Sequence, residues 1–188
     1  MKDEYIIVLD FLPKGMAASR RAEPVVLGIG NKFLNLLEII LKPDETVKSG
    51  DMVYVGEGKW DKVKLIKGKI RYNELTSYAK TELEVVIDKI INENEQKFVD
   101  FFNKAGPLTT RLHTLELLQG IGKKHMWEIL KARKNKPFSD FEDLKTRVEM
   151  LPVPKKMVKK TIISKVQIAY VYLFLLIHLL FSFLPSFF

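Results

Sequence analysis

The residues best suited to chemistry form a short glycine-containing turn, Gly120-Ile121-Gly122, followed by Lys123 and Lys124. Glycine lacks a side chain, so it can adopt left-handed backbone angles and lets a partner approach the main chain closely. A helix that begins directly after such a turn presents N–H groups without intrahelical partners, with the positive end of its dipole behind them. That arrangement binds anions, phosphate in particular, and the two lysines add positive charge. The turn therefore predicts a phosphate-binding site.

Apolar residues at helical spacing flank this turn on both sides: Leu112, Leu115 and Leu118 before it, and Met126, Ile129 and Leu130 after it. From Leu118 to Arg133 the sequence resembles the helix-hairpin-helix motif, in which hairpin amides bind nucleic-acid phosphates without reading the base sequence. Gln119 departs from the motif, which usually has proline at that position. A structural helix corner without a ligand is the alternative interpretation.

The composition narrows the classes of partner and reaction. The chain has 188 residues and a formal net charge of +8 at pH 7, which suits nucleic acid or an anionic membrane surface. It has no cysteine, which excludes disulfides and thiolate zinc sites. With only three scattered histidines, we expect no metal site and no cofactor. No catalytic motif stands out, so we expect a protein that is not an enzyme; the carboxylates of Asp140, Glu142 and Asp143 leave a metal-dependent nuclease as the least favoured alternative.

Residues 1–73 have the pattern of short strands, with candidates at Tyr5–Leu12, Val25–Gly30, Phe33–Lys42, Asp51–Gly56 and Lys62–Tyr72. Phe33–Leu41 taken alone could also be a helix. Five short strands with a long first loop predict a small OB-like β-barrel. Arg20 and Arg21 lie in that basic loop and are candidate nucleic-acid contacts.

The last of these strands carries a row of basic residues: Lys62, Lys64, Lys67, Lys69 and Arg71. Their positions differ in parity, so all five share one side of a strand only if a β-bulge inserts a residue near Leu65-Ile66. The row is then either a nucleic-acid-binding face or an ordinary solvated face, and both interpretations remain open. Trp60, in a polar turn, either stacks on bases or packs against the barrel rim.

From residue 74 the apolar period becomes helical. Residues 74–106 predict a pair of connecting helices: an apolar stripe runs from Leu75 to Ile91, with Asn73 or Thr76 as the cap, and Glu95–Lys104 continues it. The phenylalanines of the second helix, Phe98, Phe101 and Phe102, fall on one face and are expected in the core.

Residues 107–167 predict an all-α domain that contains the turn twice. Ser139 and Glu142 match a capping box, so a helix should begin there. Met150–Lys156 then aligns with Leu118–Lys124, with prolines in place of both glycines. Proline has no N–H, so this second, degenerate hairpin should keep its lysines, Lys155 and Lys156, and lose most of its amide binding.

The order of these parts resembles a small family of uncharacterised archaeal proteins, to which RNA binding is usually ascribed and which join an OB-like barrel to a helix-hairpin-helix domain. The resemblance covers about Tyr5 to Phe174, and its most specific runs are Ala79–Leu83, Phe98–Asn103, Arg111–Leu118 and Pro137–Asp143. It implies a cytoplasmic protein that binds nucleic acid, RNA favoured over DNA, in ribosome or transcription work. It implies no reaction.

The C-terminal segment, residues 168–188, is apolar and has no formal charge. As a helix it would be roughly 30 Å long, about the thickness of a bilayer's hydrocarbon core. Lysines precede it, so it could be a tail anchor that leaves the basic domains in the cytoplasm. The resemblance implies soluble proteins, and Leu175–Phe188 has the narrow alphabet that a shifted reading frame produces. We therefore favour an artefact or an unusual soluble tail over an anchor.

The sequence thus predicts an α+β protein: an OB-like barrel (1–73), connecting helices (74–106), a tandem helix-hairpin-helix domain (107–167) and an anomalous tail (168–188). Its expected function is non-catalytic binding of nucleic acid through the first hairpin and a basic barrel face. A membrane-attached basic adaptor, with membrane contact through 168–188, is the alternative.

Overall fold

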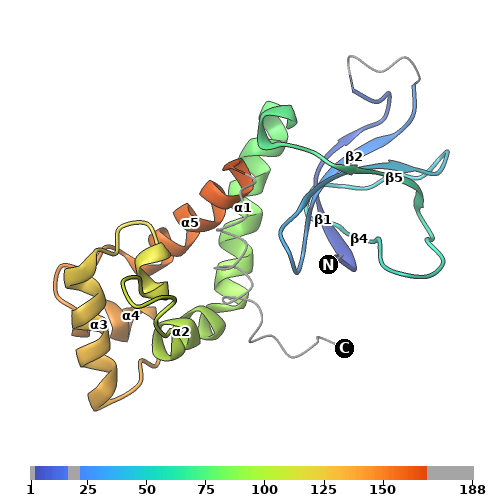
Figure 1. Cartoon of the computed structure of the whole chain (residues 1–188). Helices are drawn as coiled ribbons and strands as arrows, with labels where there is room; N and C mark the ends of the chain where they lie inside the picture. Colours follow the sequence, from blue (N-terminus) through green and yellow to red (C-terminus); the bar gives the residue numbers. More distant parts are fainter. Residues whose placement is uncertain (1–2, 17–21, 169–188) are drawn as a thin grey trace. The chain divides into compact units, whose positions relative to one another are not determined.

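The computed structural model describes residues 3–16 and 22–168 (Figure 1). Over these residues the protein is mixed α/β, with a five-stranded sheet and five α-helices. The chain divides into two compact units, Met1–Val86 with Val166–Ile168, and Ile87–Lys165. The predicted loop residues Arg20 and Arg21, and residues 169–188 of the apolar tail, lie outside the described residues.

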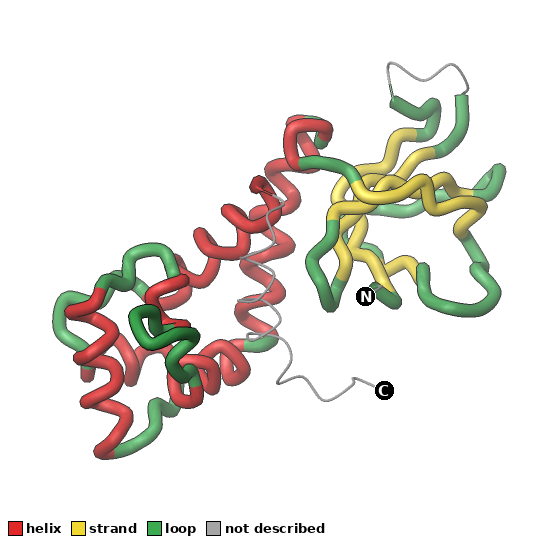
Figure 2. The backbone as a smooth tube through the Cα atoms, viewed as in Figure 1, coloured by secondary structure: helices red, strands yellow, loops and turns green. Residues whose placement is uncertain are grey.

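The first unit contains all the strands, and Figure 2 shows them in yellow: β1 Tyr5–Leu12, β2 Val25–Gly30, β3 Leu36–Leu41, β4 Met52–Tyr54 and β5 Val63–Lys69. Each neighbouring pair is antiparallel, in the order β4-β1-β2-β3-β5. The five predicted strands are therefore confirmed, and the segment that could have been helical is β3. It begins at Leu36 because the carboxylate of Asp3 accepts hydrogen bonds from the amides of Lys32 (2.9 Å) and Phe33 (2.6 Å), which holds those residues in a turn.

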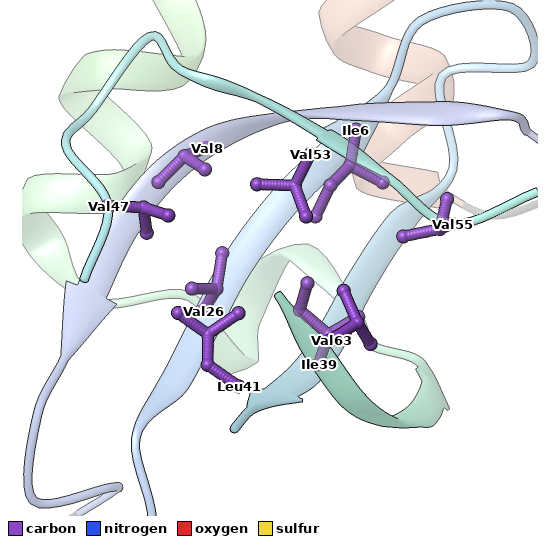
Figure 3. Close-up of a cluster of buried hydrophobic side chains, with 9 residues drawn as sticks. All are labelled: Ile6, Val8, Val26, Ile39, Leu41, Val47, Val53, Val55 and Val63. Carbon is purple, nitrogen blue, oxygen red and sulfur yellow. The ribbon is translucent and has the colours of Figure 1, made fainter. Parts of the chain in front are cut away.

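The sheet curls into a half-barrel around an aliphatic core. Every strand contributes to this core, and the segments that flank β4 add Val47 and Val55 (Figure 3). The core side chains are Ile6, Val8, Val26, Ile39, Leu41, Val47, Val53, Val55 and Val63. β-Branched side chains suit this position because they pack well on a pleated surface.

Strand β5 is irregular where the sequence predicts it. Against β3, the register skips Lys64 between Val63 and Leu65, and skips Lys67 between Ile66 and Gly68. An irregularity near Leu65-Ile66 is therefore confirmed, but it consists of two extra residues, Lys64 and Lys67, where the sequence predicts one. Two extra residues cancel in parity, so the expected placement of all five basic residues on one side of the strand is wrong. The extra residue Lys64 lets both Val63 and Ile66 pack against the core although they are three positions apart.

Two helices follow the sheet in sequence, α1 Ser77–Glu93 and α2 Glu95–Lys104, after a short 3-10 helix at Tyr72–Glu74. The cap of α1 is Thr76, whose hydroxyl oxygen accepts from the Ala79 amide (3.0 Å) and donates to the Asp10 carboxylate in β1 (2.6 Å). That second bond fixes the start of the helix to the sheet within the first unit. The three phenylalanines of α2 are buried, as predicted.

The second unit continues with a 3-10 helix, η2 Thr114–Leu117, and with α3 Lys123–Asn135, α4 Phe141–Arg147 and α5 Pro154–Ile168. The predicted cap of α4 is wrong by one residue: Asp140, not Ser139, accepts the hydrogen bond from the helix, from the Asp143 amide at 2.7 Å. The sequence holds two overlapping capping patterns, and this one places Phe141 and Leu144 in the core. Among the described residues, no helix has both the length and the apolarity to span a bilayer.

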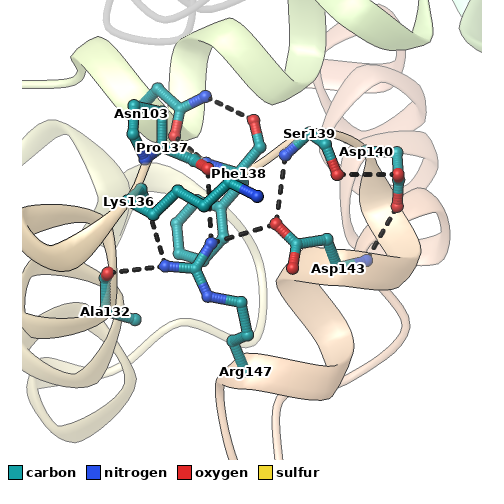
Figure 4. A network of polar contacts seen from close by, with 9 residues as sticks. All are labelled: Asn103, Ala132, Lys136, Pro137, Phe138, Ser139, Asp140, Asp143 and Arg147. Carbon is teal, nitrogen blue, oxygen red and sulfur yellow. Dashed lines mark hydrogen bonds and ion pairs between the residues drawn. The ribbon is translucent and has the colours of Figure 1, made fainter.

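Arg147 joins α4 to the end of α3 (Figure 4). Its guanidinium donates to the carbonyls of Ala132 (2.7 Å) and Lys136 (2.6 Å) and lies over the Phe138 ring at 4.6 Å. It also pairs with Asp143 at 3.0 Å. Helix carbonyls without intrahelical partners need such donors, so this network fixes where α3 ends and how it is oriented.

Candidate nucleic-acid interface

The predicted phosphate site is a tight turn, Leu118–Gly122, called the first turn from here on. The Ile121 amide donates to the Leu118 carbonyl at 3.1 Å, and the Ile121 side chain is buried. Gly120 has φ +96°, a left-handed conformation that favours glycine. Gly122 is extended (φ −97°, ψ −179°) and caps α3. Only one of the two glycines is therefore required by backbone conformation.

The helix expected before the turn is shorter than the leucine spacing indicates. Only Thr114–Leu117 is helical, as the 3-10 helix η2, and it is capped at both ends. His113 Nδ1 accepts from the Leu115 amide (3.2 Å), and the Glu116 carboxylate accepts from the His113 amide (2.9 Å). This reciprocal capping starts the helix at Thr114, and the extended backbone of Leu118 ends it.

The first turn is held from behind by α5. The Gln119 amide donates to Thr161 Oγ1 at 3.1 Å, and this hydroxyl donates in turn to the Met157 carbonyl at 2.8 Å. A Cβ added to Gly120 would lie 3.6 Å from the Pro152 side chain. Proline at position 119 would lose the bond to Thr161, which explains why this chain departs from the motif there.

The front of the turn is open. Among the described residues, the amides of Gly122, Lys123 and Lys124 donate no hydrogen bond. A Cβ at Gly122 would meet nothing within 4 Å. Lys123 and Lys124 are exposed, and Lys124 lies 3.9 Å from the Glu128 carboxylate, a loose surface pair. The predicted residues of the first turn are thus brought together as an exposed, positively charged helix start.

The second turn, Val148–Val153, has a different register from the one that the sequence alignment predicts. Leu151 closes it by donating to the Val148 carbonyl, and this bond lies 30 positions after the corresponding bond of Ile121 in the first turn. The first residues of the helices that follow the two turns, α3 and α5, are 31 positions apart. The sequence alignment uses an offset of 32. Pro154 is therefore the first residue of α5, the counterpart of Lys123 rather than of Gly122. Proline suits a first helical position because its ring pre-sets φ and no N–H is needed there.

The basic row predicted in the first unit is partly neutralised. Lys64 pairs with Glu23 and Lys67 with Glu38, each at 2.7 Å. For the remaining three, Lys62, Lys69 and Arg71, the described chain holds no carboxylate partner. Trp60 packs against the half-barrel core and donates its indole N–H to the Gly56 carbonyl at 2.9 Å.

A groove of about 450 Å³ lies beside the first turn. Arg111, Leu112 and Lys123 line it, with Met126, Trp127 and Leu130 of α3. Trp127 is 65% exposed. Sequence reasoning missed this residue, although one signal was present: Trp127 follows Lys123 by four positions and so shares its helix face.

Two of the three carboxylates considered for catalysis have structural roles, and the third, Glu142, lies 3.7 Å from Lys145 in an exposed ion pair. Asp140 caps α4, and hydrogen bonds from the Asp143 amide and the Ser139 hydroxyl lower the pKa of its carboxyl. Asp143 accepts from the Ser139 amide and pairs with Arg147. In the part of the chain that the structure describes, no group of three or more His, Asp and Glu side chains could hold a metal ion.

The fold and the site define a class: a small α/β protein with a curled antiparallel sheet and a helical unit that presents open amides at one turn. More particularly, the chain belongs to the family described as "Protein of unknown function (DUF655)", which matches residues 2–175. It is 43% identical over 151 residues to "Uncharacterized protein MJ0038" of Methanocaldococcus jannaschii, a match that covers 80% of this chain and 69% of that protein.

A solved structure shares the fold. The crystal structure of Af1531 from Archaeoglobus fulgidus, of the same family, superposes with a TM-score of 0.79 at 41% identity. The match covers 90% of this chain and 96% of that chain. The resemblance to a family of uncharacterised archaeal proteins is confirmed. The RNA binding and the helix-hairpin-helix assignment that it implies stay predictions.

The two glycines of the first turn should respond differently to alanine. Gly120→Ala places a side chain at positive φ and should lower the free energy of unfolding by about 1–2 kcal/mol. Gly122→Ala meets extended backbone and open space, and should change stability by less than about 1 kcal/mol. Urea denaturation of both variants checks this. Equal destabilisation would contradict the conformations assigned to the two residues.

His113 should make stability depend on pH. Burial, and secondarily the positive charge of Arg133, lower the pKa of His113 from its ordinary 6.5. As the pH falls, the unfolded chain therefore takes up this proton before the folded chain does. The contribution of neutral His113 to the free energy of unfolding is complete above about pH 6.5. It is lost as the pH falls through the lower pKa of His113 in the folded protein. His113→Asn keeps a capping acceptor but does not titrate. Between pH 8 and pH 5 the melting temperature of the wild type should fall relative to that of this variant; parallel profiles would contradict the assignment.

Proposed function

We propose that this protein is a non-catalytic nucleic-acid-binding protein that contacts phosphates through the first turn, with RNA favoured over DNA. The observation that carries the proposal is the set of three open amides at Gly122, Lys123 and Lys124, on an exposed helix start with two lysines. Backbone N–H groups and a helix dipole bind phosphate without reading base sequence. The preference for RNA comes from the family resemblance.

The starts of two other helices, α1 and α4, differ from the start of α3 in a way that supports the same proposal. Thr76 and Asp140 provide side-chain acceptors at the starts of α1 and α4, whereas the cap of α3 is a glycine that offers none. Uncapped N–H groups on an exposed helix start can be satisfied by water or by an anionic ligand. The first turn therefore keeps its donors available, while α5 holds its rear face in place through Thr161.

The proposal includes two finer assignments. The first turn, with η2 and α3, is a helix-hairpin-helix hairpin whose first helix is reduced to one 3-10 turn, and Val148–Lys156 is its degenerate repeat. The half-barrel is an OB-like domain whose unpaired basic residues, Lys62, Lys69 and Arg71, add phosphate contacts. Lys155 and Lys156, which follow Pro154 at the start of α5, add positive charge, and Pro154 itself has no N–H to donate. The protein acts in the cytoplasm, where it binds RNA in association with the ribosome or the transcription machinery.

Binding should be strongly dependent on salt. Contacts between basic groups and phosphates release counterions, so affinity for a labelled single-stranded RNA should fall about tenfold or more between 50 and 200 mM salt for even a few contacts. Fluorescence anisotropy measures it directly, with the same RNA in scrambled sequence as the control for sequence tolerance. A flat salt response would reject phosphate contacts as the basis of binding.

The amide contribution can be separated from the lysine charge at one position. Lys123→Gln removes the charge, whereas Lys123→Pro removes the charge and the N–H, at a first helical position where proline is accepted. The proline variant should bind RNA more weakly than the glutamine variant by on the order of 1–3 kcal/mol, because a charge-assisted hydrogen bond is lost.

The matched control lies in α5. Pro154→Ala restores an N–H at the same helix position in the second turn and should leave RNA affinity nearly unchanged. Circular dichroism must show all three variants folded. Equal affinities of the two Lys123 variants would contradict a contact between the Lys123 amide and phosphate. A change confined to Pro154→Ala would show that the second turn, and not the first, binds the phosphate.

A further inference from the structure

The groove beside the first turn has a composition that the phosphate-binding proposal does not use. Its floor is apolar, with Met126 buried and Leu112 and Leu130 half-buried. Its rim carries Arg111 and Lys123, both exposed. Phosphate binding alone needs the rim and leaves the apolar floor without a role.

Trp127 is the feature of this groove that most needs a partner. Its helix neighbours Met126 and Ile129 are 6% and 0% exposed, whereas Trp127 is 65% exposed. It therefore contributes little to the core of the second unit, although its indole is the largest apolar side chain on α3. An indole face beside cations is the surface on which bases stack in proteins that bind single-stranded nucleic acid.

The charges around the indole favour an anionic strand. Lys123 lies one helical turn before Trp127 on the same face, and Arg111 approaches from the loop that precedes η2. The carboxylate in the groove belongs to Glu116, and its Oε2 already accepts a hydrogen bond from the His113 amide at 2.9 Å. Positive charge and an exposed indole beside apolar side chains in one groove match the two parts of a nucleotide, its phosphate and its base.

We propose that this groove binds an unpaired nucleobase stacked on Trp127, in the same strand whose phosphate contacts the first turn. The inference rests on the proposed function and specifies its ligand: single-stranded nucleic acid. In a duplex, neighbouring bases cover both faces of each base, so the duplex offers phosphates to the turn but no free face to Trp127.

Three probes of equal length test it by fluorescence anisotropy: a single-stranded RNA, the same RNA as a duplex, and a single strand with abasic sites throughout. The wild type should bind the base-bearing single strand most tightly. Trp127→Ala should weaken that binding about fivefold or more and leave the abasic strand unaffected. Trp127→Phe, which keeps an aromatic face, should retain most of the affinity. Trp60→Phe, which changes the other tryptophan of the chain, is the matched control and should bind like the wild type.

The outcomes separate the two proposals. A wild type that binds none of the three probes overturns the proposed function, and the groove inference with it. Salt-dependent binding that is identical in wild type and Trp127→Ala overturns only the groove inference. A loss that is equal on the abasic and base-bearing strands, or greater on the duplex, also overturns it, because Trp127 would then act without stacking on an unpaired base.

Discussion

The organisation of the second unit depends on how backbone groups at helix ends are satisfied. Every helix begins with N–H groups and ends with carbonyls that its own turns cannot reach. Here Asp140 accepts a hydrogen bond at the start of α4, and Arg147 donates to a carbonyl near the end of α3. Arg133 donates to the carbonyls of Phe102 and Ala105 at the end of α2, both at 2.8 Å. Against this background, the start of α3 stands open on its outer side while its turn is fixed from the inner side by Thr161.

That asymmetry links packing to the proposed chemistry. A turn that must present amides to a phosphate has to be rigid before the ligand arrives, because ordering it on binding would cost affinity. Gly120 supplies the left-handed residue, Ile121 anchors the turn in the core, and Gln119 connects it to α5. The second turn supplies the surface behind it and so contributes to the site without binding phosphate itself.

Much of this could be predicted from the sequence, because it follows from local periodicity. Short apolar runs between turn residues predicted the strands of the first unit, and the 3.6-residue stripe predicted α1. Helix α2 begins and ends at the predicted residues. The parity of the lysines in β5 predicted one bulge near Leu65-Ile66, whereas the structure has one on each side of that pair. Local patterns fail where two of them overlap: capping pairs one residue apart begin at Ser139 and Asp140, and burial of Phe141 and Leu144 decides between them.

The rest depends on contacts between residues far apart in sequence. The Gln119–Thr161 bond spans 42 positions, and the ion pair of Lys64 with Glu23 spans 41, so neither the support of the turn nor the neutralised lysine is visible locally. The exposure of Trp127 likewise depends on what the rest of the unit leaves uncovered. The second turn was aligned by its lysines, whereas the structure places its helix start by the proline at position 154.

The central claim is that phosphates contact the amides of the first turn, and amide chemical shifts measure this most directly. In ¹H–¹⁵N spectra of the full chain titrated with a single-stranded RNA, the signals of Gly122, Lys123 and Lys124 should move furthest. The amides of Val153 and Lys155, at the start of α5, should move much less. Shifts confined to β5, or of equal size at the two helix starts, would contradict phosphate binding by the first turn.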